Sequence, residues 1–183
     1  MWRSLFLSTT SLVFLGGASC SDDECGPMGA PKDGLTASST EVTLSYANLI
    51  SRAGSDCPDP DAPAGVIAVT IEGMQSDGTG FITLCIPRPD LLELGNRSLG
   101  HTLSTADIRI IDVVGSSNNC TYTIDKTRPP TGKGAGLGVC ANGTDDAGFA
   151  IDIDGAISLR RTCGTTVDTI AVKLVGKIAV AAE

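Results

Sequence analysis

The chain is poor in histidine. Among 183 residues there is one, His101, in the polar stretch GNRSLGHTLST at 95–105. Any Ser-His-Asp arrangement must use it, with Ser98, Ser104 and Asp107 nearest in sequence. A single imidazole also cannot fill the three or four protein positions of a zinc site. An exposed loop histidine is the commoner role, so we expect no catalytic centre and no zinc here.

Aromatic side chains are also scarce, at 4% of the chain. Once the N-terminal segment is removed, no tryptophan is left. The aromatic residues are then Tyr46, Phe81, Tyr122 and Phe149. All four fall in expected strands, where core packing is the simpler use. The aromatic platforms of a sugar site are therefore not indicated, although folding could still bring two carboxylates to a catalytic separation.

Basic residues are outnumbered, with 13 Lys and Arg against 21 Asp and Glu. Loss of residues 1–19 removes Arg3 alone, which leaves 12 against 21 and a formal charge of −9. A surface of that sign repels phosphate backbones and anionic lipid headgroups. We expect neither nucleic-acid binding nor a polybasic membrane patch.

The chain lacks a good candidate for a permanent membrane span, which needs about 20 predominantly apolar residues. The uncharged stretch Ser4 to Ser21 is rich in Ser, Thr and Gly. Arg3, the apolar segment Leu5 to Leu15 and the small residues after it have the layout of a secretory signal peptide. We expect residues 1–19 to be removed on export.

The end of this segment, Gly17-Ala18-Ser19-Cys20, resembles the lipobox of bacterial lipoproteins, in which signal peptidase cuts before an acylated cysteine. The resemblance covers these four residues, with Gly17 where the family has Leu or a similar residue. It implies an acylated Cys20 and attachment to the outer membrane or cell surface through the N-terminal lipid. An ordinary cut after Ala18 or Ser19, giving a periplasmic or secreted protein, stays open.

The seven cysteines are an odd number, which needs an explanation in an exported protein. If Cys20 carries lipid, six remain and can close three disulfides in an oxidising compartment. The alternative joins Cys20 to Cys25 and leaves another thiol free. The six cysteines that we expect in disulfides are Cys25, Cys57, Cys85, Cys120, Cys140 and Cys163.

Residues 20–40 are polar and contain Pro and Gly, which predicts a flexible tether. Residues 41–183 are then a single domain. Short β-branched runs with period two, separated by turn signals, predict an all-β antiparallel sandwich, Ig-like or jelly-roll-like, of about eight to ten disulfide-stapled strands. The expected strands are 42–46, 66–71, 81–86, 108–114, 121–124, 137–139, 149–153, 157–159 and 167–175. Only 89–94 has a helical pattern.

A first hairpin can be placed in register around Asp154-Gly155-Ala156. A three-residue loop there sets Ile153 opposite Ile157 and Ile151 opposite Leu159, which keeps the apolar side chains on one face. Asp152 and Asp154 alternate with these isoleucines and are expected on the solvated face.

A second hairpin turns around Pro130 and sets Cys120 opposite Cys140. We expect these two cysteines to form a disulfide; the pairing of Cys25, Cys57, Cys85 and Cys163 among themselves stays open. The same register lays Tyr122 and Ile124 across Gly138 and Gly136 of the GKGAGLG stretch. This stretch fits no nucleotide-binding motif.

A cluster of carboxylates is the one remaining candidate for a metal site. Asp56, Asp59 and Asp61 lie in an acidic, proline-stiffened loop, and calcium prefers such oxygen ligands. The spacing is not that of an EF-hand. We expect no metal and no other cofactor, with calcium in this loop as the alternative.

Together these features predict an exported, lipid-anchored cell-envelope protein that acts as a non-enzymatic binding or structural module. The sequence does not identify its protein or glycan partner. The alternatives are a small extracytoplasmic hydrolase that uses His101 or an Asp pair, and a calcium-stabilised adhesion module.

Overall fold

The computed structural model describes residues 34–53, 57, 59–94, 96–101, 108–141 and 147–181. The expected signal peptide, Cys20, Cys25 and most of the expected tether lie outside these residues. Within these ranges one 3-10 helix, η1, spans Pro89–Leu94, where the sequence has its helical pattern. The strands are β1 (Leu35–Ser38), β2 (Thr43–Ala53), β3 (Val69–Gln75), β4 (Phe81–Ile86), β5 (Arg97–Gly100), β6 (Ile108–Ser117), β7 (Cys120–Ile124), β8 (Thr131–Ala141), β9 (Ala147–Cys163) and β10 (Thr166–Ala181). The all-β prediction is confirmed for the described chain.

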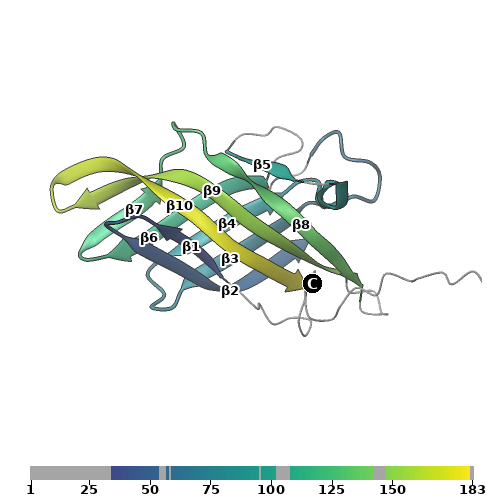
Figure 1. The fold of residues 1–183 in the computed structure, drawn as a ribbon, viewed down its shortest axis with the longest axis horizontal. Helices are drawn as coiled ribbons and strands as arrows, with labels where there is room; N and C mark the ends of the chain where they lie inside the picture. The colour runs from purple at the N-terminus through teal and green to yellow at the C-terminus, as the bar shows by residue number, and fades with distance from the viewer. Residues whose placement is uncertain are drawn as a thin grey trace, which may run out of the picture.

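All ten strands of the described chain belong to one mixed sheet with the order β10-β1-β2-β3-β4-β6-β5-β8-β9-β7. Two further pairings, β10 with β9 and β6 with β7, close this sheet on itself. Figure 1 shows the result, with β8, β9 and β10 crossing in front of β2, β3 and β4. Strand pairing continues around the molecule, so the expected division into two stacked sheets is not confirmed.

The long strand β9 explains how the sheet closes. One of its edges pairs with β10 from Gly148 to Cys163. Its other edge pairs first with β8 and then with β7. At one end β7 bridges β9 to β6, and at the other end β8 and β5 do so. The pair β5–β6 is parallel.

Alternating apolar residues point into the closed sheet and fill it. Because successive side chains of a strand face opposite sides, period-two patterns place one set inside and the other outside. Gly134 faces the interior, where a Cβ would meet Ile108 and Ile153. The buried core includes Leu35, Leu44, Tyr46, Ile71, Ile82, Leu84, Ile108, Ile110, Ile151, Ile153, Leu159, Val172, Leu174 and Ile178.

The first expected hairpin is wrong, because β9 runs without a turn through Asp154 and Gly155. Gly155 faces inward, and a Cβ there would meet Thr131 and Leu99. This glycine therefore permits close packing instead of a turn. The actual hairpin joins β9 to β10 through Gly164 and Thr165, and Gly164 has a φ of 60°.

The second expected hairpin register is also wrong. Strand β7 pairs with β6 and β9, not with β8. Cys120 lies opposite Cys163 and is disulfide-bonded to it, with a Cα–Cα distance of 4.4 Å. Cys140 lies opposite Gly148 in the β8–β9 ladder. The predicted Cys120–Cys140 disulfide is therefore not formed in this structure.

The predicted cover of the glycine-rich strand differs in the same way. Tyr122 lies opposite Arg161, and Ile124 lies opposite Leu159. Gly136 instead approaches Leu92 of η1, whose carbonyl oxygen leaves no room for a Cβ. Gly134 therefore makes room for core side chains and Gly136 for η1.

Three further features concern β1 and two turns. The segment Leu35–Ser38, which we assigned to the tether, forms β1 between β10 and β2 and buries Leu35 and Ala37. Residues 76–80 form the turn that joins β3 to β4, and Gly78 in this turn has a φ of 71°. Asn118 and Asn119 form the β6–β7 turn with φ values of 52° and 60°, as a type I′ hairpin turn requires.

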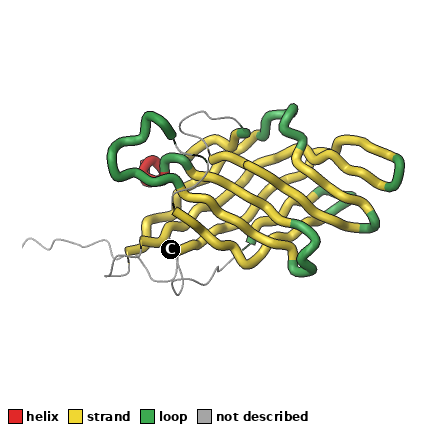
Figure 2. The backbone as a smooth tube through the Cα atoms, turned by 180° about the vertical axis from the view of Figure 1, so that it is seen from behind, coloured by secondary structure: helices red, strands yellow, loops and turns green. Residues whose placement is uncertain are grey.

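Within the described residues, no helix has the length and apolar character needed to cross a membrane. Loops gather at the two ends of the strands (Figure 2). One of them, residues 59–68 together with Cys57, packs on the outside of the sheet and is called the covering loop below.

Candidate functional site

The covering loop buries a patch of the outer sheet face. Cys57 and Ala68 pack there with Cys85 of β4 and with the partly buried Ile111 of β6. Cys57 and Cys85 are disulfide-bonded, with a Cα–Cα distance of 6.4 Å. This second, smaller core fixes the loop to β4 and β6.

Arg109 is the largest buried side chain of the protein's described part, with 1% of its surface exposed. Its neighbours Ile108 and Ile110 point into the main core, so alternation directs Arg109 outward. The register sets it opposite Cys85, and its Nη1 donates to the Cys57 carbonyl oxygen at 3.5 Å. Burying a guanidinium without polar partners costs free energy. The hydrogen bond to the Cys57 carbonyl oxygen therefore stabilises Arg109 in its buried position under the covering loop.

A carboxylate of the covering loop is buried near a second arginine. The Asp59 side chain is fully buried, and its Oδ2 lies 3.7 Å from Nη1 of Arg88. Its Oδ1 accepts the Asp61 backbone N–H at 3.0 Å. Asp59 Oδ2 has no hydrogen-bond partner within the described residues. Asp59 therefore shapes the loop and balances the charge of Arg88.

Arg88 is itself held by a second carboxylate. Its Nε and Nη2 donate to Asp90 Oδ1 and Oδ2 at 2.9 and 2.7 Å. These two bonds lower the pKa of Asp90 and raise that of Arg88. The fork geometry matches guanidinium to carboxylate. Arg88 therefore orders the start of η1 and also faces the covering loop.

The candidate ligands of the calcium alternative have different surroundings. Asp59 is buried against Arg88, whereas Asp61 is exposed; Asp56 lies outside the described residues. In the described ranges, no three His, Cys, Asp or Glu side chains are grouped as metal ligands. A guanidinium beside Asp59 is an unfavourable neighbour for a cation.

His101 is oriented by the backbone. Its Nδ1 lies 3.2 Å from the carbonyl oxygen of Ile110, and its Nε2 is buried without a hydrogen-bond partner among the described residues. As Nδ1 faces an acceptor, it carries the proton in this arrangement. Ser98 is exposed on β5, and Ser104 and Asp107 lie outside the described residues.

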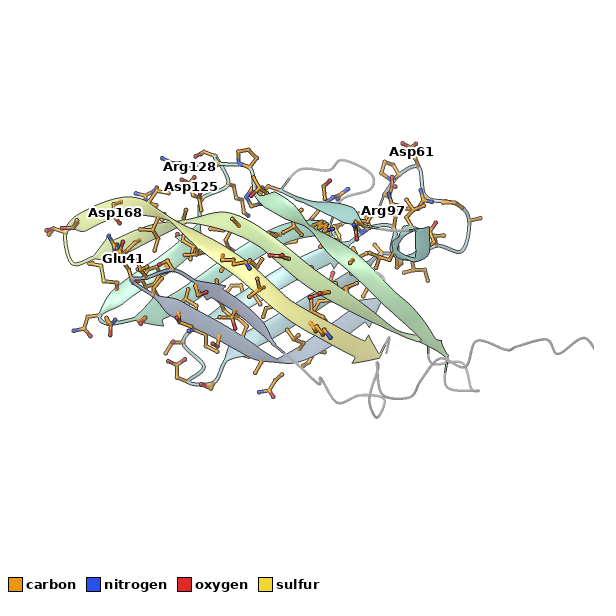
Figure 3. The ribbon with its side chains drawn as sticks, in the orientation of Figure 1. Glu41, Asp61, Arg97, Asp125, Arg128 and Asp168 are labelled. Carbon is orange, nitrogen blue, oxygen red and sulfur yellow. A yellow bond between two sulfur atoms is a disulfide. The ribbon has the colours of Figure 1, made fainter. Side chains whose placement is uncertain are left out.

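The opposite end of the sheet carries an ion-pair network that sequence reasoning missed. Arg161 continues the inward face of Ile157 and Leu159. Its Nε donates to Asp168 Oδ1 at 2.8 Å, its Nη2 contacts Asp168 Oδ2, and its Nη1 contacts Glu41. Figure 3 shows Glu41 and Asp168 together at this end. The network joins the β9–β10 hairpin to the β1–β2 turn.

The positions of Arg109 and Arg88 have local signals in the sequence, although their burial does not. Arg109 follows the first residue of the expected strand 108–114, next to Ile108 and Ile110, at a position that alternation assigns to the outside. Arg88 precedes Pro89 and Asp90 at the one expected helical turn. Their burial depends on the covering loop, which carries no periodic pattern.

Comparison of the chain with protein-family models, with curated proteins and with solved structures finds no match in any of the three.

Proposed function

We propose that this protein is an exported envelope protein, anchored through an acylated Cys20, and that it acts as a non-enzymatic binding or structural module. The observation that carries the proposal is the filled interior of the closed sheet. Large apolar side chains occupy it, and Leu92 of η1 joins the same core. Because the interior is filled, a partner would bind to the outer surface of the domain.

The disulfides support export. Cys57–Cys85 and Cys120–Cys163 join segments that are distant in sequence, and such bonds persist in oxidising compartments. Cys20, Cys25 and Cys140 are then the cysteines left to assign. If Cys20 is acylated, Cys25 and Cys140 can close the third bridge. A disulfide from Cys20 to either of them would contradict the anchor.

The described polar residues support a non-catalytic role. His101 Nδ1 faces a backbone carbonyl, Asp59 faces Arg88, and Asp90 is taken up by the same arginine. None of the three is paired with a nucleophile in these contacts. An acid-base role would require a different arrangement.

Two measurements test the proposal. Cys20→Ala should move the protein from the membrane fraction to the soluble fraction, whereas the wild-type protein should require detergent for its extraction from the membrane. A screen of ester, peptide and glycoside substrates should be blank. Turnover that disappears in His101→Ala would establish the hydrolase alternative instead.

A further inference from the structure

An exposed apolar row crosses the outer face of four strands. The register places Ala47 opposite Met74, Met74 opposite Phe81, and Phe81 opposite Val114, on β2, β3, β4 and β6. Met74 and Phe81 keep 50% and 40% of their surface exposed. Side chains directly opposite on one sheet face contact each other. These four residues, called the apolar row, therefore form one continuous strip.

The neighbouring row carries negative charge. Ile50, which is 45% exposed, lies opposite Glu72; Glu72 lies opposite Thr83, and Thr83 opposite Asp112. On the other side of the strip, Asp77 lies in the β3–β4 turn, where bonds from Thr79 lower the pKa of its carboxyl group. The strip is thus flanked by carboxylates.

Basic residues are few around this face. On β2, Arg52 lies opposite Thr70, two residues after Ile50. The segments 69–86 and 110–124, which form β3, β4, β7 and most of β6, contain neither Lys nor Arg. Arg109 of β6 is buried under the covering loop, and Arg160, opposite Thr123, bounds the region on β9.

The clustering distinguishes this face from ordinary surface. Single exposed apolar residues are normal on proteins. Here, however, Ile50, Met74 and Phe81 are three of the five large apolar side chains that the described residues expose, and they share one face. Contiguous exposed apolar side chains with a polar border are typical of interaction sites.

We infer that the apolar row and its acidic border bind a basic amphipathic protein segment. Apolar side chains of the partner would cover Met74 and Phe81, and its Lys or Arg residues would face Asp77 and Asp112. Anionic lipid headgroups have the wrong charge for this border. The inference rests on the proposed role as a binding module and specifies its partner.

The probe is a labelled synthetic peptide with Leu on one helical face and Lys on the other, titrated against the full exported chain by fluorescence anisotropy. A second peptide replaces each Lys by Glu. We expect saturable binding of the Lys peptide at least tenfold tighter than that of the Glu peptide. The double variant Met74→Ser with Phe81→Ser should weaken it tenfold or more, because it removes the apolar contact.

Matched variants separate this face from general charge attraction. Asp112→Asn should weaken binding severalfold, whereas Asp61→Asn, an equal charge change on the covering loop, should not. Val167→Ser, an exposed apolar residue on the β9–β10 hairpin, should also leave binding unchanged. Unfolding midpoints verify that each variant is folded.

Several outcomes would overturn the inference. They are no saturable binding, equal binding by both peptides, or equal losses in Asp61→Asn and Asp112→Asn. Dependence of dimer formation or of binding to anionic vesicles on Met74 and Phe81 would assign the face to a second copy or to a membrane. Binding is measured whether or not Cys20 is acylated, so failure of the anchor and failure of this surface are separate results.

Discussion

Cys120 of β7 and Cys163 of β9 lie directly opposite each other and form a disulfide across the junction that closes the sheet. Replacement of both by Ser should destabilise the protein by about 2–5 kcal/mol, because the bond constrains the unfolded chain. Denaturant unfolding of the variant and the wild type measures the difference.

The peptide map of the non-reduced protein checks the pairing itself. We expect one linked peptide with Cys120 and Cys163 and another with Cys57 and Cys85. A peptide that links Cys120 to Cys140 would contradict the β7–β9 pairing and restore the register expected from sequence.

Gly134 tests how tightly the interior is filled. Because a Cβ there would meet Ile108 Cδ1, Gly134→Ala should cost about 1–3 kcal/mol of unfolding free energy. Ile108→Val removes that methyl group and costs about 0.5–1.5 kcal/mol alone.

A double variant tests whether a steric clash with Ile108 causes the destabilisation by Gly134→Ala. Gly134→Ala with Ile108→Val should be less destabilised than the sum of the single variants, because the two residues compete for one space. Full additivity in chemical denaturation would show that the clash is not the cause.

The strand predictions succeeded where alternation alone decides the structure. Phe81–Ile86 was predicted with its observed bounds, and 108–114 lies within β6. Alternation failed at Gly155, because Ile151, Ile153, Ile157 and Leu159 share one face in a continuous strand as they do in a hairpin with a three-residue loop. Only the contacts of Gly155 with Thr131 and Leu99 separate these alternatives.

The sequence also did not predict which distant strands pair with each other. Cys120 and Cys163 meet because β7 inserts between β6 and β9, and no local spacing encodes that closure. Strand β1 has only four residues and lies in a polar stretch. Its apolar residues Leu35 and Ala37 are buried because the strand pairs with β10 on one side and β2 on the other. Arg109 and Asp59 were similarly hidden, since their burial depends on the covering loop.

Asp59 provides a test of that loop. Asp59→Ala removes the acceptor of the Asp61 N–H and the carboxylate beside Arg88. The loss should cost about 1–3 kcal/mol and raise amide exchange in residues 59–68, as followed by mass spectrometry. Ca²⁺ should leave the wild-type unfolding midpoint unchanged; a rise that Asp59→Asn abolishes would support the calcium alternative.

Acid should weaken the end of the sheet that Arg161 closes. Hydrogen bonds from Arg161 lower the pKa of Asp168 below its ordinary value near 4. A carboxyl group with a lowered folded-state pKa contributes stability above its unfolded pKa, and the contribution disappears as pH falls through the folded value. Asp168→Asn should therefore flatten the stability curve below about pH 4.

The control for this pH effect is Asp61→Asn, the same chemical change at an exposed carboxylate. Thermal midpoints of both variants and the wild type between neutral and acidic pH give the comparison. Equal acid dependence in Asp168→Asn and the wild type would show that the Arg161 contact does not contribute.

The anchor at Cys20 is tested most directly by the intact mass of the N-terminal peptide from protein purified in detergent. We predict a peptide that begins at Cys20 and carries diacylglycerol on its sulfur atom, with no disulfide at that residue. A peptide that begins at Ser19 or Cys20 with a free amine and no lipid, or one in which Cys20 is disulfide-bonded, would contradict the proposal.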